Sequence, residues 1–256
     1  EMLRSLVGSE MCIRDRSTTG MTPSRHPMRS LSLYEQAFRA SFRTFYGEPA
    51  RWSLYALLPN YLRRKGSSLV YMADRLLSDC GSGGFYLDDH EALLEAMRRD
   101  PKPKILLGVS YALWDLAERY APKLENTVIM ETGGMKGYRE EIPKEEFHKI
   151  LCGAFGVGAI HSEYGMAELT SQAYSQGGNL FRCPPWMRVT TRDVNDPFDP
   201  QPAGTRGGLN IADLANWWSC AFIQTQDVGR VDARGAFVVE GRIDHSDIRG
   251  CNLLVQ

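Results

Sequence analysis

The chain has 256 residues, of which 43% are hydrophobic and 24% are charged. This composition is close to the globular average and excludes collagen-like, coiled-coil and fully disordered proteins. The length allows one large domain or two small ones, at about 100–200 residues each. Because 30 basic and 31 acidic side chains leave a net charge of −1, no overall positive field is available to hold a nucleic acid or an acidic membrane. We therefore expect a small molecule or a protein as the partner, and no nucleic acid.

The cysteines and the apolar runs indicate the compartment. No C-x-x-C pair is present, so the thiols fit neither a disulfide framework nor a zinc site. No apolar run approaches the ~20 residues that a membrane span requires, and the N-terminus lacks the order of a signal peptide. We expect a cytoplasmic protein with reduced thiols and no membrane span. The six cysteines are Cys12, Cys80, Cys152, Cys183, Cys220 and Cys251.

Residues 1–16 (EMLRSLVGSEMCIRDR) differ from the rest of the chain. They resemble a translated sequencing adapter rather than part of any protein family, and such segments are excluded from fold reasoning. We therefore predict that residues 1–16 are not native and that a natural segment before Ser17 is missing. The alternative is an ordinary N-terminal helix, because apolar residues recur at helical spacing: Leu3, Leu6, Val7 and Met11.

The next part, residues 17–175, alternates between helical and strand-like patterns. Aromatic residues at helical intervals, ended by Gly47 and Pro49, predict an amphipathic helix over 32–46. A short strand over 68–72 leads into a helix over 73–77, and Asp88 or Asp89 caps a helix over 91–99. Further strands (105–107, 127–130, 157–160) alternate with helices (111–120, 144–155). This alternation predicts an α/β fold, with a mostly parallel sheet covered by helices on both faces.

After Ser175 the pattern changes to strand-like runs separated by Pro, Gly and Asp turns. We predict a β-rich subdomain and a C-terminal hinge tail over 176–256, with strands over 188–191, 208–211, 219–225 and 236–240. His90 and His148 are expected on helix surfaces. The tryptophans are expected in the core or at the subdomain interface: Trp52, Trp114, Trp186, Trp217 and Trp218.

Two motifs carry side chains suited to nucleotide chemistry. The first, 17–26 (STTGMTPSRH), has hydroxyls, a glycine and two basic side chains that can contact phosphate oxygens; an ordinary surface loop has a similar composition. The second, 161–168 (HSEYGMAE), follows a predicted strand, where open α/β sheets bind ligands. There Tyr164 can stack on a base and Glu168 can bind Mg²⁺. The alternative is a strand-to-helix turn with a buried tyrosine and a capping glutamate.

Two further motifs lie near the C-terminus. In 225–229 (TQDVG), Asp227 can accept hydrogen bonds from a ribose diol or simply close a turn. The motif 241–250 (GRIDHSDIRG) is charged and bounded by glycines, which suits a hinge or a solvated loop. His26 and His161 lie inside motifs and are therefore the histidines expected to contact a ligand.

Taken in this order, the motifs resemble those of the adenylate-forming synthetase superfamily over nearly all of the chain from Ser17. The wording YGMAELTSQAYS and GRIDHSDIRGCN is most similar to the LuxE-type acyl-protein synthetases, which activate a fatty acid as acyl-AMP and pass it to a cysteine on the enzyme. The resemblance implies phosphate contacts from Ser17, Thr18, Thr19, Gly20, Arg25 and His26, and adenine contacts from Gly133, Gly134, Tyr164 and Gly165. It also implies Mg²⁺ binding by Glu168, ribose binding by Asp227, nucleotide binding by Arg242 and a hinge at Asp244.

The chain departs from this superfamily in several places. The phosphate loop starts at Ser17 without its leading glycine or serine, and Ala167 replaces the threonine that precedes the motif glutamate. Gln226 replaces a glycine found in most members. Most members also have a C-terminal domain that carries a lysine, whereas this sequence ends six residues after Gly250.

From the resemblance we expect an enzyme that uses ATP and Mg²⁺ to activate a fatty or related carboxylic acid, with Glu168, His161 and Cys251 in catalytic roles. Cys251 is the expected acyl acceptor, because nearby Arg249 and Arg242 favour its thiolate. It can instead be a small buried hydrophobe, with a partner protein as acceptor. Two other functions stay open: an acyl- or aryl-CoA ligase of the phenylacetate-CoA ligase kind, and a catalytically silent nucleotide- or acyl-binding protein.

Overall fold

The structure is a computed structural model that describes residues 11–15, 24–58, 67–133 and 142–243. Several predicted site residues lie outside these ranges, and Arg25 is described only through its backbone, within a strand. The site residues outside the described part are Ser17, Thr18, Thr19, Gly20, Gly134, Asp244 and Cys251.

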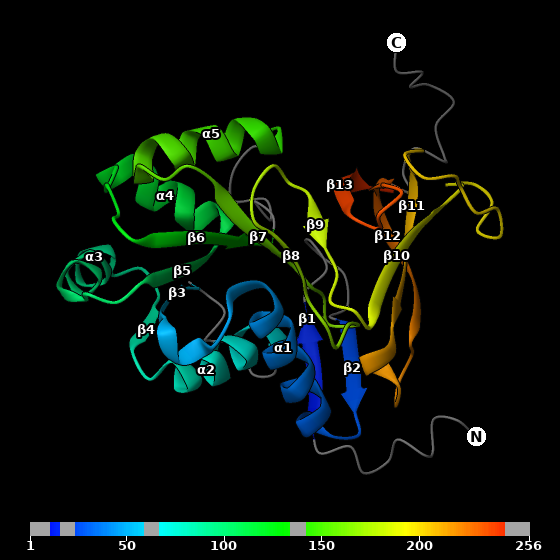
Figure 1. Cartoon of the computed structure of the whole chain (residues 1–256), viewed down its shortest axis with the longest axis horizontal. Helices are drawn as coiled ribbons and strands as arrows, with labels where there is room; N and C mark the ends of the chain where they lie inside the picture. The colour runs from blue at the N-terminus through cyan, green and yellow to red at the C-terminus, as the bar shows by residue number, and fades with distance from the viewer. Residues whose placement is uncertain (1–10, 16–23, 59–66, 134–141, 244–256) are drawn as a thin grey trace.

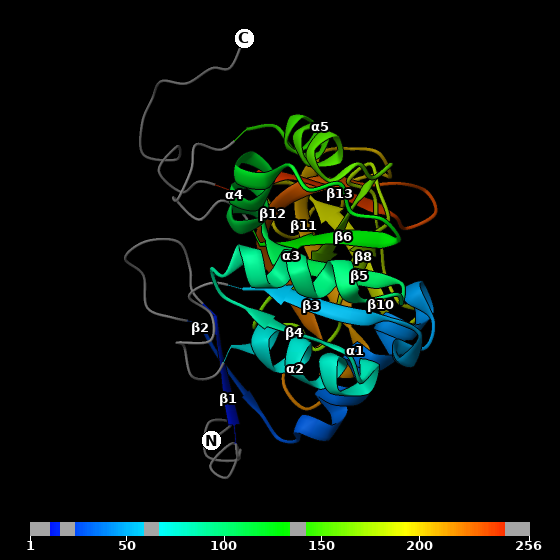
Figure 2. The same ribbon diagram turned by 90° about the vertical axis from the view of Figure 1, so that its left-hand side faces the viewer.

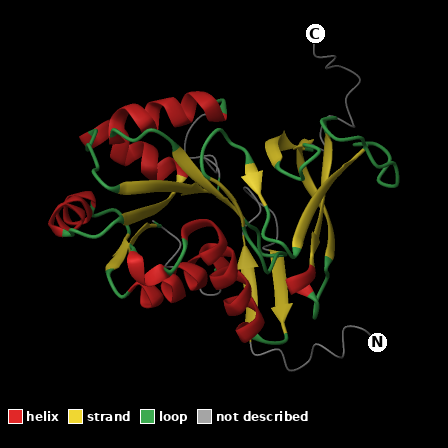
Figure 3. Cartoon of the chain, viewed as in Figure 1, coloured by secondary structure: helices red, strands yellow, loops and turns green. Residues whose placement is uncertain are grey.

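A mixed sheet of eleven strands runs through most of the described chain (Figures 1 and 3). Its first five strands are parallel, in the order β4 (Gly83–Tyr86), β3 (Ser53–Leu57), β5 (Lys104–Val109), β6 (Thr127–Thr132) and β7 (Ile160–Tyr164). Antiparallel strands continue it: β8 (Ala173–Ser175), β9 (Phe181–Arg182), β13 (Phe237–Arg242), β12 (Phe222–Val231), β11 (Gly207–Asp213) and β10 (Met187–Arg192). The predicted α/β class with a β-rich second part is confirmed.

Helices cover both faces of the parallel strands (Figure 2). On one face lie α4 (Ser110–Tyr120) and α5 (Lys144–Phe155), and on the other α1 (Leu31–Tyr46) and α2 (Ser68–Cys80). Strands β3 and β5 are buried along their whole length, as expected for parallel strands between two helical layers. Helix α3 (His90–Arg99) packs against the core through its buried side chains Leu93 and Met97. No described helix is both long and apolar enough to cross a membrane.

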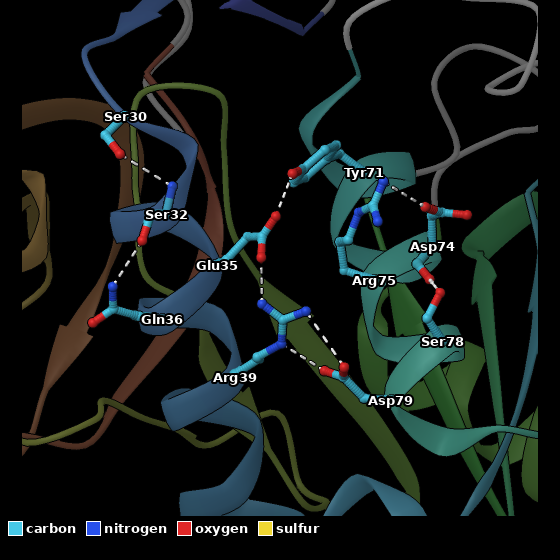
Figure 4. Close-up of polar contacts among 10 residues, drawn as sticks. All are labelled: Ser30, Ser32, Glu35, Gln36, Arg39, Tyr71, Asp74, Arg75, Ser78 and Asp79. Carbon is cyan, nitrogen blue, oxygen red and sulfur yellow. Dashed lines mark hydrogen bonds and ion pairs between the residues drawn. The ribbon is translucent and has the colours of Figure 1, made fainter.

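A polar network joins α1 to α2 (Figure 4). The Arg39 guanidinium donates to Asp79 at 2.6 Å and to Glu35 at 2.5 Å, and the Tyr71 hydroxyl also donates to Glu35. Hydrogen bonds from Tyr71 and Arg39 lower the pKa of Glu35. Because Arg39 and its partners are about a quarter exposed, each pair contributes about 1 kcal/mol or less. The buried Phe38 contributes more, since deleting such a ring typically costs about 3–5 kcal/mol.

The predicted strand over 68–72 is wrong, because these residues form the first turn of α2. The Ser67 hydroxyl accepts a hydrogen bond from the backbone N–H of Val70 and caps the helix. Met72 and Leu76 are buried at helical spacing. The strand of this unit is β3, which the sequence analysis missed.

The predicted strand over 157–160 is also misplaced. Gly156, at φ 72°, ends α5 in the left-handed conformation, and β7 starts only at Ile160, where it pairs with Ile129 of β6. His161 and Tyr164 therefore lie within the strand rather than on the turn after it. The predicted helix over 144–155 is confirmed at both ends.

Strands β10, β11 and β13 confirm the runs predicted over 188–191, 208–211 and 236–240. The strand predicted over 219–225 is displaced, because β12 starts only at Phe222 and continues to Val231. The short strands β8 and β9 were not predicted. Two tryptophans are not in the core: Trp217 is 71% exposed and Trp218 is 49% exposed, and Arg29 lies over the Trp218 ring at 4.1 Å. His90 is buried rather than on the surface, because its ring packs edge-on against Tyr120.

The N-terminal strands β1 (Met11–Asp15) and β2 (Ser24–Met28) form a separate two-stranded antiparallel sheet. Residues 11–15 are therefore extended, which excludes the alternative of a helix for that part of the N-terminus. An isolated two-stranded ribbon is only marginally stable in water. The non-native origin of residues 1–16 stays a prediction.

Candidate functional site

The candidate site lies at the carboxyl ends of β6 and β7, the edge at which open α/β sheets bind ligands. Successive residues there point to opposite faces of the sheet. On the face covered by α1 and α2, the Thr132 hydroxyl donates to Glu163 at 2.5 Å. On the face covered by α4 and α5, the Ser162 hydroxyl donates to Glu131 at 2.6 Å. Both faces of this edge thus carry a buried carboxylate.

Three residues that the sequence analysis singled out meet at the junction of β7 with the antiparallel strands. The Tyr164 hydroxyl donates to Asp227 Oδ2 at 2.7 Å, and Arg242 Nε lies 3.5 Å from Asp227 Oδ1. Burial and the Asp227 carboxylate raise the pKa of Tyr164, so its hydroxyl keeps its proton and remains a donor. The Tyr164 ring packs edge-to-face against Phe181 and Phe237. Asp227 lies within β12, not in a turn.

Gly165 borders a cavity of about 60 Å³ on the α1 and α2 face. A Cβ atom at Gly165 would come within 2.4 Å of Glu163 Oε1, so only glycine leaves this carboxylate in place. Gln172 also lines the cavity, and its buried Oε1 accepts no hydrogen bond from the described residues. The cavity, which also reaches Thr132 and Gly133, is large enough for a group of a few heavy atoms.

The turn that carries Glu168 is fixed by two residues from the β-rich part. Asp213 Oδ2 accepts hydrogen bonds from the backbone N–H groups of Thr170 and Ser171, at 2.9 and 2.8 Å. The Asn216 side-chain amide donates to the Glu168 carbonyl oxygen at 2.7 Å. Neither Asp213 nor Asn216 is predicted from the sequence. In the sequence, these two polar residues only flank a short apolar pair. That local pattern does not predict partners more than 40 residues away.

The two motif histidines occupy different places. His26 Nε2 lies 3.1 Å from Asn216 Oδ1, which brings the end of the first motif next to the Glu168 turn. His161 Nδ1 lies 3.1 Å from the Tyr46 hydroxyl, on the face of the sheet opposite to Tyr164. Burial lowers the pKa of both imidazoles, which favours their neutral form.

Glu168 is half-buried on this turn, and the preceding Ala167 is fully buried. Within the described ranges, no three or more His, Cys, Asp or Glu side chains are grouped so as to hold a metal ion. Mg²⁺ in nucleotide sites is commonly held by one or two carboxylates together with substrate phosphates. Magnesium binding by Glu168 stays a prediction: its carboxylate is of the type that such sites use, as one oxygen donor.

We predict that Asp213→Ala destabilises the fold by about 2–5 kcal/mol, because it leaves the buried donors of Thr170 and Ser171 without an acceptor. Asp213→Asn keeps one acceptor oxygen and is expected to lose about half as much. Urea unfolding followed by circular dichroism measures both values. Equal stability of Asp213→Ala and the wild type would contradict the role of this carboxylate.

No model of a known protein family matches the chain, and no curated protein matches it. Its fold is similar to that of many solved structures, among them the following three. ATP-bound MatB from Rhodopseudomonas palustris is 15% identical, over 90% of this chain and 47% of that one, with a TM-score of 0.67. The amide bond synthetase McbA from Marinactinospora thermotolerans is 19% identical, over 91% and 49%, at 0.65. O-succinylbenzoate coenzyme A synthetase (MenE) from Bacillus subtilis, in complex with AMP, is 17% identical, over 92% and 49%, at 0.63. The chain thus spans about half the length of these proteins and shares their fold over that part.

Proposed function

We propose that this chain is the nucleotide-binding part of an enzyme that activates a carboxylic acid as an acyl-AMP. The observation that carries the proposal is the Tyr164–Asp227–Arg242 group at the carboxyl end of β7, where the antiparallel strands begin. It combines a fixed carboxylate acceptor, an aromatic ring and a guanidinium, which together suit a ribose, a base and a phosphate. The similarity of the fold to ATP-bound MatB and AMP-bound MenE supports the same conclusion.

In this proposal each part of ATP has its own contacts. Asp227 accepts hydrogen bonds from the ribose hydroxyls, and the adenine lies between Tyr164 and the glycine turn at 133–134. The hydroxyl-rich loop at 17–20, with Arg25 and His26, contacts the phosphates. The contact between His26 and Asn216 supports this assignment, because Asn216 also holds the Glu168 turn.

The chemistry is electrostatic. A carboxylate oxygen of the acid attacks the α-phosphorus of ATP, the bond to pyrophosphate breaks, and acyl-AMP forms. Fixed donors around the phosphates stabilise the charge that spreads over the phosphoryl oxygens, and Mg²⁺ held by Glu168 supplies further positive charge when bound. No described residue has to act as a base, because the attacking carboxylate is already ionised at neutral pH.

The resemblance to LuxE-type synthetases favours a fatty or related acid as substrate and Cys251 as acceptor. The Cys251 thiolate attacks the acyl carbonyl, AMP leaves, and a thioester forms. In an acyl-CoA ligase the thiol of CoA takes this place. The buried Ala167, which offers no hydroxyl to the reacting groups, favours a second candidate function, a nucleotide-binding protein without catalysis.

Loss of the Asp227 carboxylate tests the ribose contact. We expect Asp227→Ala to weaken ATP binding by about 1.5–3 kcal/mol, because hydrogen bonds to a charged group are lost. Tyr164→Phe keeps the ring and removes only the hydroxyl that donates a hydrogen bond to Asp227. It should therefore weaken ATP binding less than Asp227→Ala does. Titration calorimetry measures both affinities. If Asp227→Ala binds ATP as tightly as the wild type, Asp227 is not the ribose acceptor.

Pyrophosphate release tests the proposed reaction. The protein is incubated with ATP, Mg²⁺ and a panel of carboxylic acids, and we expect release that depends on one class of acid. Glu168→Gln should reduce the rate by ~10²-fold or more, the scale of losing one transition-state contact. Glu91→Gln, at an exposed position on α3, is the matched control and should retain the full rate. ATP binding without pyrophosphate release for any acid would favour the non-catalytic alternative.

A labelled fatty acid identifies the acyl acceptor. With ATP and Mg²⁺, we expect hydroxylamine-labile label on the protein, and its loss in Cys251→Ser. Cys220→Ser, which removes an exposed thiol elsewhere, should keep the label. Label that persists at its original level in Cys251→Ser would assign the acceptor role to another cysteine. Transfer to CoA with no labelled protein would favour the ligase.

A further inference from the structure

Glu131, next to the candidate site at the end of β6, is a buried carboxylate that the proposed chemistry does not use. Glu131 is only 1% exposed at the end of β6, and it is surrounded by polar groups from three other parts of the fold. Ser162 of β7 donates to its Oε1 at 2.6 Å, and Ser110 at the start of α4 lies 2.9 Å from its Oε2. From α5, Lys144 forms an ion pair with Oε1, and His148 Nε2 lies 3.6 Å from the same oxygen. One side chain therefore connects β6, β7, α4 and α5.

Stability alone does not account for this arrangement. Burying a carboxylate carries a desolvation cost that a paired cation only partly offsets, and apolar residues of similar size often serve a core as well or better. Although burial raises the pKa of Glu131, the Lys144 charge and the hydrogen bonds outweigh it and hold the pKa at about 2. Glu131 is thus a permanent anion near neutral pH. What it provides is a fixed geometry among the elements that it joins.

That geometry extends to the nucleotide site through Ser110. Its hydroxyl oxygen lies 2.8 Å from the Gly133 carbonyl oxygen as well as 2.9 Å from Glu131, so its single hydrogen is shared between the two acceptors. Gly133, at φ 67°, has a backbone conformation that favours glycine, and it lines the cavity next to Glu163. Ser110 and Glu131 therefore fix the peptide at the rim of the cavity.

Lys144 adds a second restraint. The chain leaves β6 after Thr132 and enters α5 at Lys144, so the ion pair between Glu131 and Lys144 joins the two ends of this connection. Lys144 is about one-third exposed, whereas Glu131 is not. Removing the lysine charge would leave the carboxylate buried with only hydroxyl donors and a histidine nearby.

We propose that Glu131 and Lys144 are positioning residues, whose ion pair holds the Gly133 peptide and the end of β7 at the spacing needed for ATP and the acid. This inference rests on the proposed function for what is bound there. The geometric restraint itself is independent of that function. It adds to the site two residues that touch neither ATP nor the acid.

Three variants test the pair. Lys144→Met removes the cation, Lys144→Arg restores it, and Glu131→Gln keeps the size of the side chain while removing its charge. We expect Lys144→Met and Glu131→Gln to weaken ATP binding by on the order of ten- to a hundredfold, the scale of small displacements in a preorganised site. Lys144→Arg should recover most of the affinity. Lys149→Met, which removes an exposed lysine from the same helix, should have no effect.

Hydrogen exchange by mass spectrometry gives a readout that does not need activity. We expect faster exchange in peptides that cover 127–133 and 160–164 in Lys144→Met and Glu131→Gln, but not in Lys149→Met. Melting temperatures establish that each variant is folded at the assay temperature. Folded variants with unchanged exchange and wild-type ATP affinity would overturn the inference. If the wild type binds no ATP while exchange changes as expected, the proposed function fails and the restraint stands.

Discussion

The Asp213 carboxylate is the constraint on which the candidate site depends. It is completely buried at the end of β11, yet it accepts hydrogen bonds from the backbone of the turn that follows β7. Buried N–H groups without an acceptor cost about 1–3 kcal/mol each, so the turn is stable only with Asp213 in place. Because Asp213 belongs to the antiparallel strands and β7 is the last parallel strand, this interaction fixes the Glu168 turn relative to Asp227.

A second buried carboxylate, Glu131, fixes the other side of the site. Asp213 accepts hydrogen bonds mainly from backbone N–H groups, whereas Glu131 contacts Lys144 and two serine hydroxyls. In the proposed reaction, charge spreads over the phosphoryl oxygens, and donors stabilise this charge well only when they need no rearrangement. Asp213 and Glu131 do not stabilise this charge themselves. Asp213 fixes the backbone of Thr170 and Ser171, and Glu131, through Ser110, fixes the Gly133 peptide.

The fold and the site support the function to different degrees. One fold can host several chemistries, so the likeness to MatB, McbA and MenE establishes the architecture alone. The Tyr164–Asp227–Arg242 group is a particular arrangement of three side chains, so it supports nucleotide binding more strongly than the fold does. The cavity beside Gly165, with Glu163 and Gln172 in its wall, is a separate place at which variants can probe binding of the proposed acid substrate.

The sequence by itself determined the helices over 32–46 and 144–155, the change to a β-rich part, and the motif residues that meet around Asp227. Periodicity and capping are local, and they predict such features well. Residues 68–72 were assigned wrongly because their β-type side chains also suit one face of a helix, which the Ser67 cap and the buried Met72 decide. Only the tertiary structure showed that Asp213, Asn216 and Glu131 are structural anchors, because the partners that give them this role lie 13 to 190 residues away along the chain. A polar residue becomes a structural anchor only when folding buries it beside a donor from a distant part of the chain, and local sequence patterns do not predict that contact.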